Sequence, residues 1–269
     1  MQERHRNRTL YFKELSETCN NYFIPYITAW NEVGKGMKVL EIGCGEGGNL
    51  LPFSMIGCDV TGVDIASCRI EEARRLFHEK QANAEFIADD FFNLKEPKHK
   101  YDLIICHDVL EHIANKDLFL VRICNFLNND GIVFISFPAW HMPFGGHQQI
   151  CRHKILSHLP FVHLLPLSIY KSIIRLAKES DACLNELLSI RSNRITIEAF
   201  ENIVHRTELA ISNRTLWFIN PHYKVKFGLK PCKLKKPFSS IPYIRNYLCS
   251  SCFYILRLED NNTEWQETV

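Results

Sequence analysis

The sequence lacks the long apolar segment that a membrane-spanning helix requires. Such a helix needs roughly 20 consecutive apolar residues, whereas the most apolar stretch, residues 161–174, is shorter and contains His163, Pro166 and Lys171. The first residues, MQERHRNRTLYF, are charged and have no apolar core of the kind found in secretory signals. We therefore expect a cytoplasmic protein without a transmembrane segment.

A disulfide framework and a recognisable metal motif are also missing. The 11 cysteines are odd in number and scattered through apolar segments, which is typical of reduced thiols in a cytosolic protein. The C-x-x-C pair of Cys249 and Cys252 lies in a strand-like segment, where residues three apart point to opposite faces. Neither a zinc site nor a redox motif is therefore expected there. His147, Cys151 and His153 fit no strong metal-ligand spacing, so we expect no bound metal.

Acidic residues are absent from Leu209 to Leu258, although the whole chain has a formal charge of only +2. The same segment carries nine cationic residues: Arg214, Lys224, Lys226, Lys230, Lys233, Lys235, Lys236, Arg245 and Arg257. The small total charge argues against a nucleic-acid partner. The local excess indicates either a solvated basic face or contact with an anionic acceptor or membrane surface.

Strand-like and helix-like segments alternate through the first half of the chain. Strands are expected at residues 38–42, 59–64, 85–88, 101–106 and 131–137, with helices that include residues 67–80 and 117–127. This alternation predicts an α/β fold with a doubly wound, Rossmann-like, mostly parallel sheet. Strand-like residues 209–219 and 248–258 complete seven strands, with an antiparallel edge strand.

The alternation breaks after the fifth strand, where residues 138–194 are rich in His, Pro and Leu and show no convincing strand. We therefore expect a helical insertion. The predicted parts are an N-terminal helical cap (1–36, with a helix from Thr9 to Trp30), a cofactor-binding core (37–137), a helical lid (138–195) and the C-terminal part of the core sheet (196–269).

A glycine loop follows the first expected strand. Gly43, Gly45 and Gly48 have the spacing G-x-G-x-x-G, which lets backbone N–H groups approach a polar ligand at a helix N-terminus. Asp64 ends the next strand, where an acid can accept hydrogen bonds from two ribose hydroxyls. These features alone fit a nicotinamide or flavin enzyme equally well.

Five motifs in register resemble those of class I methyltransferases, in particular the type 11/12 group that includes quinone-biosynthesis O-methyltransferases. They are VLEIGCGEG (39–47), GVDI (62–65), FIADDF (86–91), YDLIICHDVLEHI (101–113) and LNNDGIVFISFP (127–138). Glu41 stands where dinucleotide folds usually have an apolar residue. The resemblance spans about half of the chain and implies S-adenosyl-L-methionine as the cofactor.

The resemblance also implies roles for single residues. The loop of Gly43, Cys44, Gly45 and Gly47 would contact the methionine part of the cofactor, and Glu41 fits the same ligand. Asp64 would hold the ribose and Ile65 would pack on the adenine. Asp90 would accept from the adenine amine beside the backbone of Phe91, but Asp89 stands where the family often has glycine. Which of these two acids faces the adenine therefore stays open.

Three histidines are candidates for contact with the acceptor. His107 follows the fourth strand, where open α/β sheets bind ligands, and would border the sulfonium as a base or as a cofactor contact. His141 and His147 follow the fifth strand in what is either an acceptor-contacting loop or an ordinary polar loop. Methyl transfer needs alignment of the acceptor, and a base where the acceptor must lose a proton. We expect all three to point into a pocket under the lid.

The leading expectation is methyl transfer from S-adenosylmethionine to an oxygen or nitrogen of a small molecule. An NAD(P)-dependent oxidoreductase and a non-catalytic Rossmann-like binding protein are the alternatives; Glu41 and the pair of Asp89 and Asp90 argue against the first. No N-P-P-Y-type sequence follows the fourth strand, so a nucleic-acid acceptor is not expected. An aromatic, lipid-like or sugar-linked acceptor fits the lid composition, and the basic segment from Leu209 to Leu258 could favour an anionic one. The oligomeric state is not specified.

Overall fold

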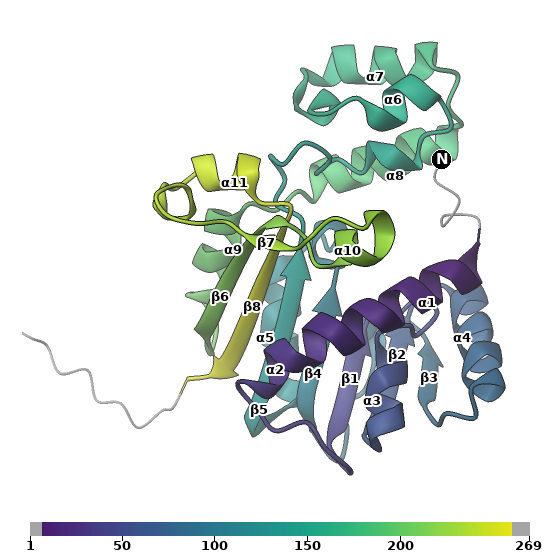
Figure 1. Ribbon diagram of the computed structural model, residues 1–269, viewed down its shortest axis with the longest axis vertical. Coiled ribbons are helices and arrows are strands. Elements are labelled where there is room, and N and C mark those ends of the chain that lie inside the picture. Colours follow the sequence, from purple (N-terminus) through teal and green to yellow (C-terminus); the bar gives the residue numbers. More distant parts are fainter. Residues whose placement is uncertain (1–6, 260–269) are drawn as a thin grey trace, which may run out of the picture.

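The computed structural model describes residues 7–259 and shows one eight-stranded sheet with the strand order β3-β2-β1-β4-β5-β8-β6-β7 (Figure 1). Five strands run parallel: β1 (Lys38–Ile42), β2 (Asp59–Asp64), β3 (Glu85–Ala88), β4 (Tyr101–His107) and β5 (Leu127–Phe137). Strand β8 (Ser251–Leu258) lies antiparallel between β5 and β6 (Leu209–Ile219). The predicted Rossmann-like fold with an antiparallel edge is confirmed.

The central strands are buried on both faces because successive side chains enter different cores. Leu40 and Ile104 belong to one core, with residues of α5 (Lys116–Phe126) and α9 (Ile197–Val204). Val39 and Ile105 belong to the other, with residues of α1 (Arg8–Thr18), α3 (Leu50–Ile56) and α4 (Ser67–Glu79). Helices therefore cover both faces of the sheet (Figure 1).

The N-terminal helix that the sequence predicts is divided into three consecutive parts. Helix α1 continues as a π-helical turn, Cys19–Phe23, and then as α2 (Ile24–Thr28). Pro25 lies at the start of α2 and has no N–H to donate to the preceding turn. This missing donor accounts for the irregular turn just before it.

The segment after β5 is helical, as predicted for an insertion. It contains α6 (Lys154–His158), α7 (Leu167–Leu176) and α8 (Asp181–Ser192), and its described residues form no strand. The insertion has a small core of its own, made of Cys151, Leu156, Val162, Tyr170, Ile174, Leu184 and Leu187. In Figure 1 these helices stand above the carboxyl ends of the parallel strands.

Two sequence expectations need correction. The sheet has eight strands and not seven, because Cys232–Lys233 forms a short strand, β7, that pairs with β6. Cys249 precedes β8, so it does not obey the alternation of a strand, and its sulfur lies 3.5 Å from that of Cys252. The two thiols therefore face each other and not opposite sides.

Two short helices, α10 (His222–Phe227) and α11 (Ile244–Leu248), flank β7. Across residues 7–259, no helix has both the length and the apolar composition that crossing a bilayer requires.

Candidate functional site

The carboxyl ends of β1 to β4 border a cavity of about 620 Å³. Six of the residues predicted to bind the cofactor line it: Gly43, Asp64, Ile65, Asp89, Asp90 and Phe91. This is where an open α/β sheet places its ligand, because the strand order reverses between β1 and β4.

The glycine loop approaches this cavity closely because its backbone adopts conformations that favour glycine. Gly43 has a φ of +72°, and a Cβ there would lie 2.4 Å from Cγ2 of Val109. Gly47 has a φ of +79° and would place a Cβ 2.9 Å from the ring of Phe86. Cys44, Gly45 and Gly47 shape the loop without lining the cavity themselves.

Asp64 connects the loop to the second strand. Its Oδ2 accepts a hydrogen bond of 2.9 Å from the backbone N–H of Gly45, and its Oδ1 accepts one of 2.8 Å from that of Ala66. A carboxylate oxygen can accept more than one hydrogen bond. The two amides therefore orient the carboxylate while leaving it able to hold ribose hydroxyls.

Asp90 and Asp89 shape the turn after β3. Asp90 Oδ1 caps the turn by accepting a hydrogen bond of 2.9 Å from the backbone N–H of Phe92. Asp89 Oδ1 accepts hydrogen bonds from the backbone N–H of Asp90 and from Nδ2 of Asn93. Both acids line the cavity, so which of them faces the adenine stays a prediction. Ile65, 74% exposed, lies at the same cavity and presents an apolar surface to a ring.

Glu41 is buried and does not line the cavity. Asn49 Nδ2 donates a 2.7 Å hydrogen bond to its Oε1. Burial raises the pKa of Glu41 from its ordinary value of 4.5 to about 8, an effect that the bond from Asn49 partly offsets. Any influence of Glu41 on the cofactor therefore acts through the loop and not through a lining contact.

A second cavity, of about 280 Å³, adjoins the first and shares Arg69, Asp108, His112 and Glu186 with it. It is lined from three directions: by Arg8 and Tyr11 of α1, by Phe144 and His147 of the loop after β5, and by His222, Tyr223 and Lys226 of α10. Aromatic rings are frequent, and three cationic residues, Arg8, Arg69 and Lys226, face two acids, Asp108 and Glu186. This lining suits a ligand that combines a flat ring with negative charge.

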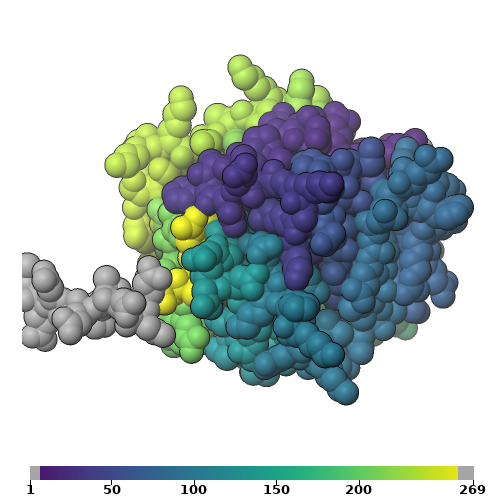
Figure 2. Space-filling model, turned by 90° about the horizontal axis from the view of Figure 1, so that it is seen from below, coloured from purple at the N-terminus to yellow at the C-terminus, as the bar shows by residue number. Residues whose placement is uncertain are grey.

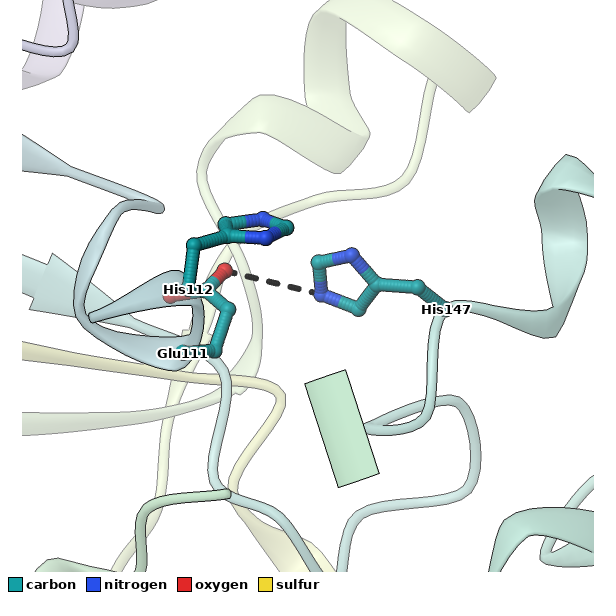
Figure 3. A group of neighbouring side chains, drawn as sticks. All are labelled: Glu111, His112 and His147. Carbon is teal, nitrogen blue, oxygen red and sulfur yellow. Dashed lines mark ion pairs between the residues drawn. The ribbon is translucent and has the colours of Figure 1, made fainter. Parts of the chain in front are cut away.

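Glu111 and His147 meet at this second cavity (Figure 3). Nε2 of His147 lies 3.5 Å from Oε1 of Glu111, and its other ring nitrogen points away from Glu111. Burial, followed by the charge of Asp108, raises the pKa of Glu111 well above its usual range. A positive charge beside this buried carboxyl, such as a protonated imidazole, therefore favours its ionised form.

His112 completes the cluster, with its ring perpendicular to that of His147 and 5.8 Å away. Burial lowers the pKa of His112. Ligand atoms of Glu111, His112 and His147 lie within 4.8 Å of one another. These types of ligand, at this spacing, are able to chelate a divalent ion.

The loop after β5 is built to hold His147 in place. His147 has a φ of +56°, and the preceding Gly146 packs so closely that a Cβ would lie 2.2 Å from Cβ of His163. Nε2 of the buried Gln148 donates to the carbonyls of Pro143 (3.1 Å) and Leu159 (3.0 Å). Both neighbours of His147 are thus fixed by packing or hydrogen bonds.

The other two predicted histidines lie elsewhere. His107 lines neither cavity; its Nδ1 is 2.5 Å from Oγ of Ser136, and its ring packs at 4.9 Å against Phe23. His141 stacks on Tyr247 at 5.0 Å and lines a separate pocket with Trp140 and His163. The structure therefore brings His147, but not His107 or His141, to the second cavity.

The metal alternative considered for His147, Cys151 and His153 is not supported as a single cluster. His147 joins Glu111 and His112, whereas Cys151 lies beside Cys183 and Glu179. Nδ1 of His153 accepts from the backbone N–H of Leu156.

Several residues of the second cavity and of the cluster around His147 escaped prediction. Glu111 and His112 are adjacent in the fourth motif, and an acid next to a histidine could have been recognised in the sequence as a candidate site. Tyr11, Glu186 and Tyr223 come from helices far apart in sequence. No local pattern marks these three residues.

Comparison with known proteins supports the methyltransferase assignment that the five sequence motifs predict. Residues 34–156 match the family model described as a methyltransferase domain. Among curated proteins, the ubiquinone biosynthesis O-methyltransferase of Chelativorans sp. (strain BNC1) is 31% identical over 126 residues, which are 47% of this chain and 50% of that protein. The homologue from Bartonella quintana (strain Toulouse) is 29% identical, over 44% and 50% of the two chains. The chain spans about half the length of these relatives.

Solved structures show the same fold along nearly the whole chain. The plantazolicin methyltransferase BpumL, in complex with a pentazolic desmethylPZN analogue and SAH, has a TM-score of 0.57 at 17% identity, covering 96% of this chain and 89% of that one. Magnesium protoporphyrin IX methyltransferase (ChlM) from Synechocystis PCC 6803, with bound SAH, has a TM-score of 0.55 at 15% identity, covering 91% and 84%. The matched domain, the five motifs and the cavity at the glycine loop identify residues 34–156 as a class I S-adenosylmethionine-dependent methyltransferase domain.

Proposed function

We propose that the protein transfers the methyl group of S-adenosylmethionine to an oxygen or nitrogen of a small molecule bound in the second cavity. The observation that carries the proposal is that the two cavities adjoin and share Arg69, Asp108, His112 and Glu186. A cofactor in the first cavity and an acceptor in the second would meet at these residues. Alignment of the two is the main requirement of an in-line displacement.

In this proposal, His147 is the base. An acceptor hydroxyl or amine that loses a proton on methylation needs a group able to take it. The ring nitrogen of His147 that points away from Glu111 takes this proton, while Nε2 keeps its contact with the carboxyl (Figure 3). Glu111 then stabilises the resulting imidazolium and holds the ring in one orientation. Glu111 is thus a positioning residue.

The lining of the second cavity favours an aromatic acceptor that carries an anionic group. Tyr11, Phe144 and Tyr223 offer flat apolar surface, and Arg8 and Lys226 offer positive charge. The curated relatives are named ubiquinone biosynthesis O-methyltransferases, which is compatible with an aromatic acceptor that is methylated on an oxygen. A cytoplasmic location remains part of the proposal.

Two measurements test the proposal. Calorimetry should show tighter binding of S-adenosylhomocysteine than of NAD or NADP. Incubation with S-adenosylmethionine and a panel of phenols and anilines, with and without a carboxylate, should then yield S-adenosylhomocysteine above the rate without acceptor. Tighter binding of a nicotinamide nucleotide would overturn the cofactor assignment. If only the phenols and anilines without a carboxylate are methylated, the proposal of an anionic acceptor is wrong.

A further inference from the structure

The segment from Lys224 to Tyr247 has an unusual surface composition. It contains six lysines and one arginine but no acidic residue. It also exposes seven large apolar side chains, between 38% and 70%: Phe227, Leu229, Phe238, Ile241, Tyr243, Ile244 and Tyr247. We call residues 224–247 the basic platform. Apolar side chains gathered in this number on a surface usually mark an interaction site.

The platform forms an outer layer of the molecule. In Figure 2 its light-green atoms stand out along the upper edge, beside the purple N-terminal helix. Five of its lysines are exposed: Lys224, Lys230, Lys233, Lys235 and Lys236. The platform lies outside residues 34–156, which match the methyltransferase family. Its surface is therefore a property of this chain beyond the shared domain.

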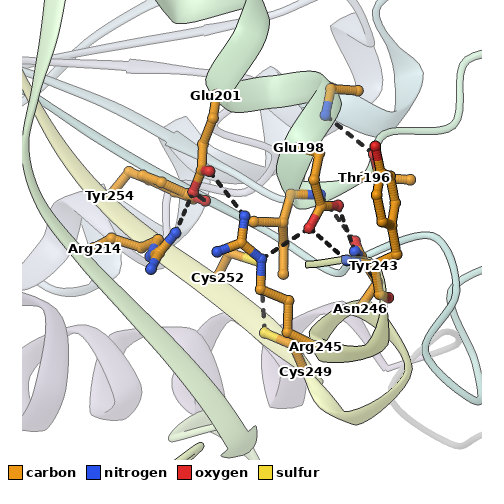
Figure 4. A network of polar contacts seen from close by, with 12 residues as sticks. Thr196, Glu198, Glu201, Arg214, Tyr243, Arg245, Asn246, Cys249, Cys252 and Tyr254 are labelled. Carbon is orange, nitrogen blue, oxygen red and sulfur yellow. Dashed lines mark hydrogen bonds and ion pairs between the residues drawn. The ribbon is translucent and has the colours of Figure 1, made fainter. Parts of the chain in front are cut away.

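A buried polar network anchors the C-terminal end of the platform (Figure 4). Arg245 donates to Glu198 (2.8 Å) and to Glu201 (2.9 Å) of α9. Oδ1 of Asn246 accepts from the backbone N–H of Ile197, and its Nδ2 donates to Glu198. Arg214 of β6 also pairs with Glu201. These two acids are therefore occupied by arginines and do not neutralise the exposed lysines.

The N-terminal end of the platform is held as well. Just before it, Nδ1 of His222 lies 2.8 Å from Oγ1 of Thr18 in α1, and Asn220 Oδ1 accepts from the N–H of His222. In the middle, Leu234 N–H donates to the carbonyl of Leu216 beside the β6–β7 pairing. The exposed apolar groups thus belong to a fixed segment, and their exposure is not the result of a detached loop.

We propose that the basic platform docks the protein onto an anionic membrane surface. Lysines attract acidic headgroups, and the interleaved Phe, Ile, Leu and Tyr side chains enter the interface between headgroups and acyl chains. The apolar side chains distinguish this surface from one built for nucleic acid, where cations and polar groups contact phosphates and bases. The platform begins next to Tyr223 and includes Lys226, both at the second cavity. Docking therefore brings the mouth of that cavity close to the membrane.

Vesicle binding by the full chain tests this proposal independently of methyl transfer. Vesicles of phosphatidylcholine alone are compared with vesicles that also contain phosphatidylglycerol, at low and high salt. We expect co-sedimentation with the phosphatidylglycerol vesicles, weakened by salt. Replacing Lys230, Lys233, Lys235 and Lys236 together by Glu should lower the affinity at least about tenfold.

The matched control replaces four exposed lysines outside the platform, Lys35, Lys80, Lys95 and Lys98, by Glu. It changes the net charge by the same amount and should keep most of the binding. A second variant, Phe238→Ser with Ile241→Ser, should weaken binding at low salt, because it removes the inserted groups. Circular dichroism and S-adenosylhomocysteine affinity establish that each variant is folded.

Three outcomes would overturn the proposal. The first is failure of the native chain to bind phosphatidylglycerol vesicles, whether or not it binds duplex DNA. The second is an equal loss of affinity in both lysine variants, which would show dependence on net charge alone. The third is unchanged binding of the double serine variant, which would exclude insertion.

Discussion

Nε2 of His147 lies 3.5 Å from Oε1 of Glu111, although the two residues come from different loops, one after β4 and one after β5. The carboxyl is buried while the imidazole is partly exposed to the second cavity. A buried acid that orients an accessible histidine is the arrangement expected of a base and its positioning residue. The first prediction concerns this pair.

Replacing His147 by Ala should lower turnover about 10²–10⁴-fold with an acceptor that must lose a proton. Cofactor affinity should stay nearly unchanged, because His147 does not line the first cavity. In the native enzyme, turnover should fall toward acid pH as the base becomes protonated. His205→Ala, at an exposed position after α9, is the matched control. Full activity of His147→Ala would show that His147 is not the base and that the enzyme acts only by aligning the acceptor with the methyl group.

Glu111→Gln should have a smaller effect than loss of His147, because the amide still packs but no longer stabilises a charged imidazole. The pH dependence of turnover should therefore shift relative to the native enzyme, while the Michaelis constant for the cofactor changes little. Added Zn²⁺ or Mg²⁺ provides a further readout at the cluster of Glu111, His112 and His147. Activity that requires the ion, and an unshifted pH profile in Glu111→Gln, would argue for a metal and against a base.

Asp64→Ala should weaken binding of S-adenosylhomocysteine by about 1.5–3 kcal/mol, the scale for hydrogen bonds to a charged group. The variant also loses the bonds from Gly45 and Ala66, so its folding is checked by urea denaturation. Asp59→Ala, at the exposed opposite end of β2, is the control and should bind normally. An unchanged dissociation constant in folded Asp64→Ala would show that the carboxylate does not hold the ribose.

The parallel sheet was predictable because its strands are short apolar runs buried by two cores, and because each of the first four ends in, or is followed by, glycine or an acid. The orientation of His107 follows from the same alternation. Ile105 belongs to the core that contains Phe23, and His107, two residues later, turns its ring to Phe23. Its absence from the cavities was therefore deducible from the strand pattern.

Other features depend on contacts that no local pattern encodes. The two-residue strand β7 exists through its pairing with Trp217 and Ile219 of β6. The pair of Glu111 and His147 depends on how two loops fold against each other. Cys249 lies two residues before β8 begins, and an error of that size in a predicted boundary reverses the side on which its thiol lies.

The pKa of Glu41 predicts a pH-dependent stability. Burial raises it from 4.5 to about 8 in the folded protein, so between these pH values the folded state holds a proton that the unfolded state has released. Stability therefore falls as pH rises through this window. With about 1.4 kcal/mol per pKa unit, the loss is on the order of a few kcal/mol. Glu41→Gln keeps an acceptor for Asn49 and should reduce this slope in urea titrations at several pH values; an identical slope would contradict the assignment.

Gly146→Ala should damage both stability and turnover through sterics alone. The added Cβ would lie 2.2 Å from Cβ and 2.5 Å from Cγ of the buried His163, and overpacking of this kind costs about 1–3 kcal/mol. If the turn shifts to relieve the clash, His147 moves away from Glu111, and a displacement of this kind can lower turnover about 10²-fold.

The matched control is Gly34→Ala, where an added Cβ meets no atom within 4 Å and φ is not positive. This variant should be neutral or about 0.4–1 kcal/mol more stable, because alanine restricts the unfolded chain. Urea denaturation separates the two variants by stability. Calorimetry with S-adenosylhomocysteine should give native affinity for both, since neither glycine lines the first cavity. If Gly146→Ala is destabilised as expected yet turns over at the native rate, the position of His147 does not limit catalysis, and the role assigned to its pairing with Glu111 is wrong.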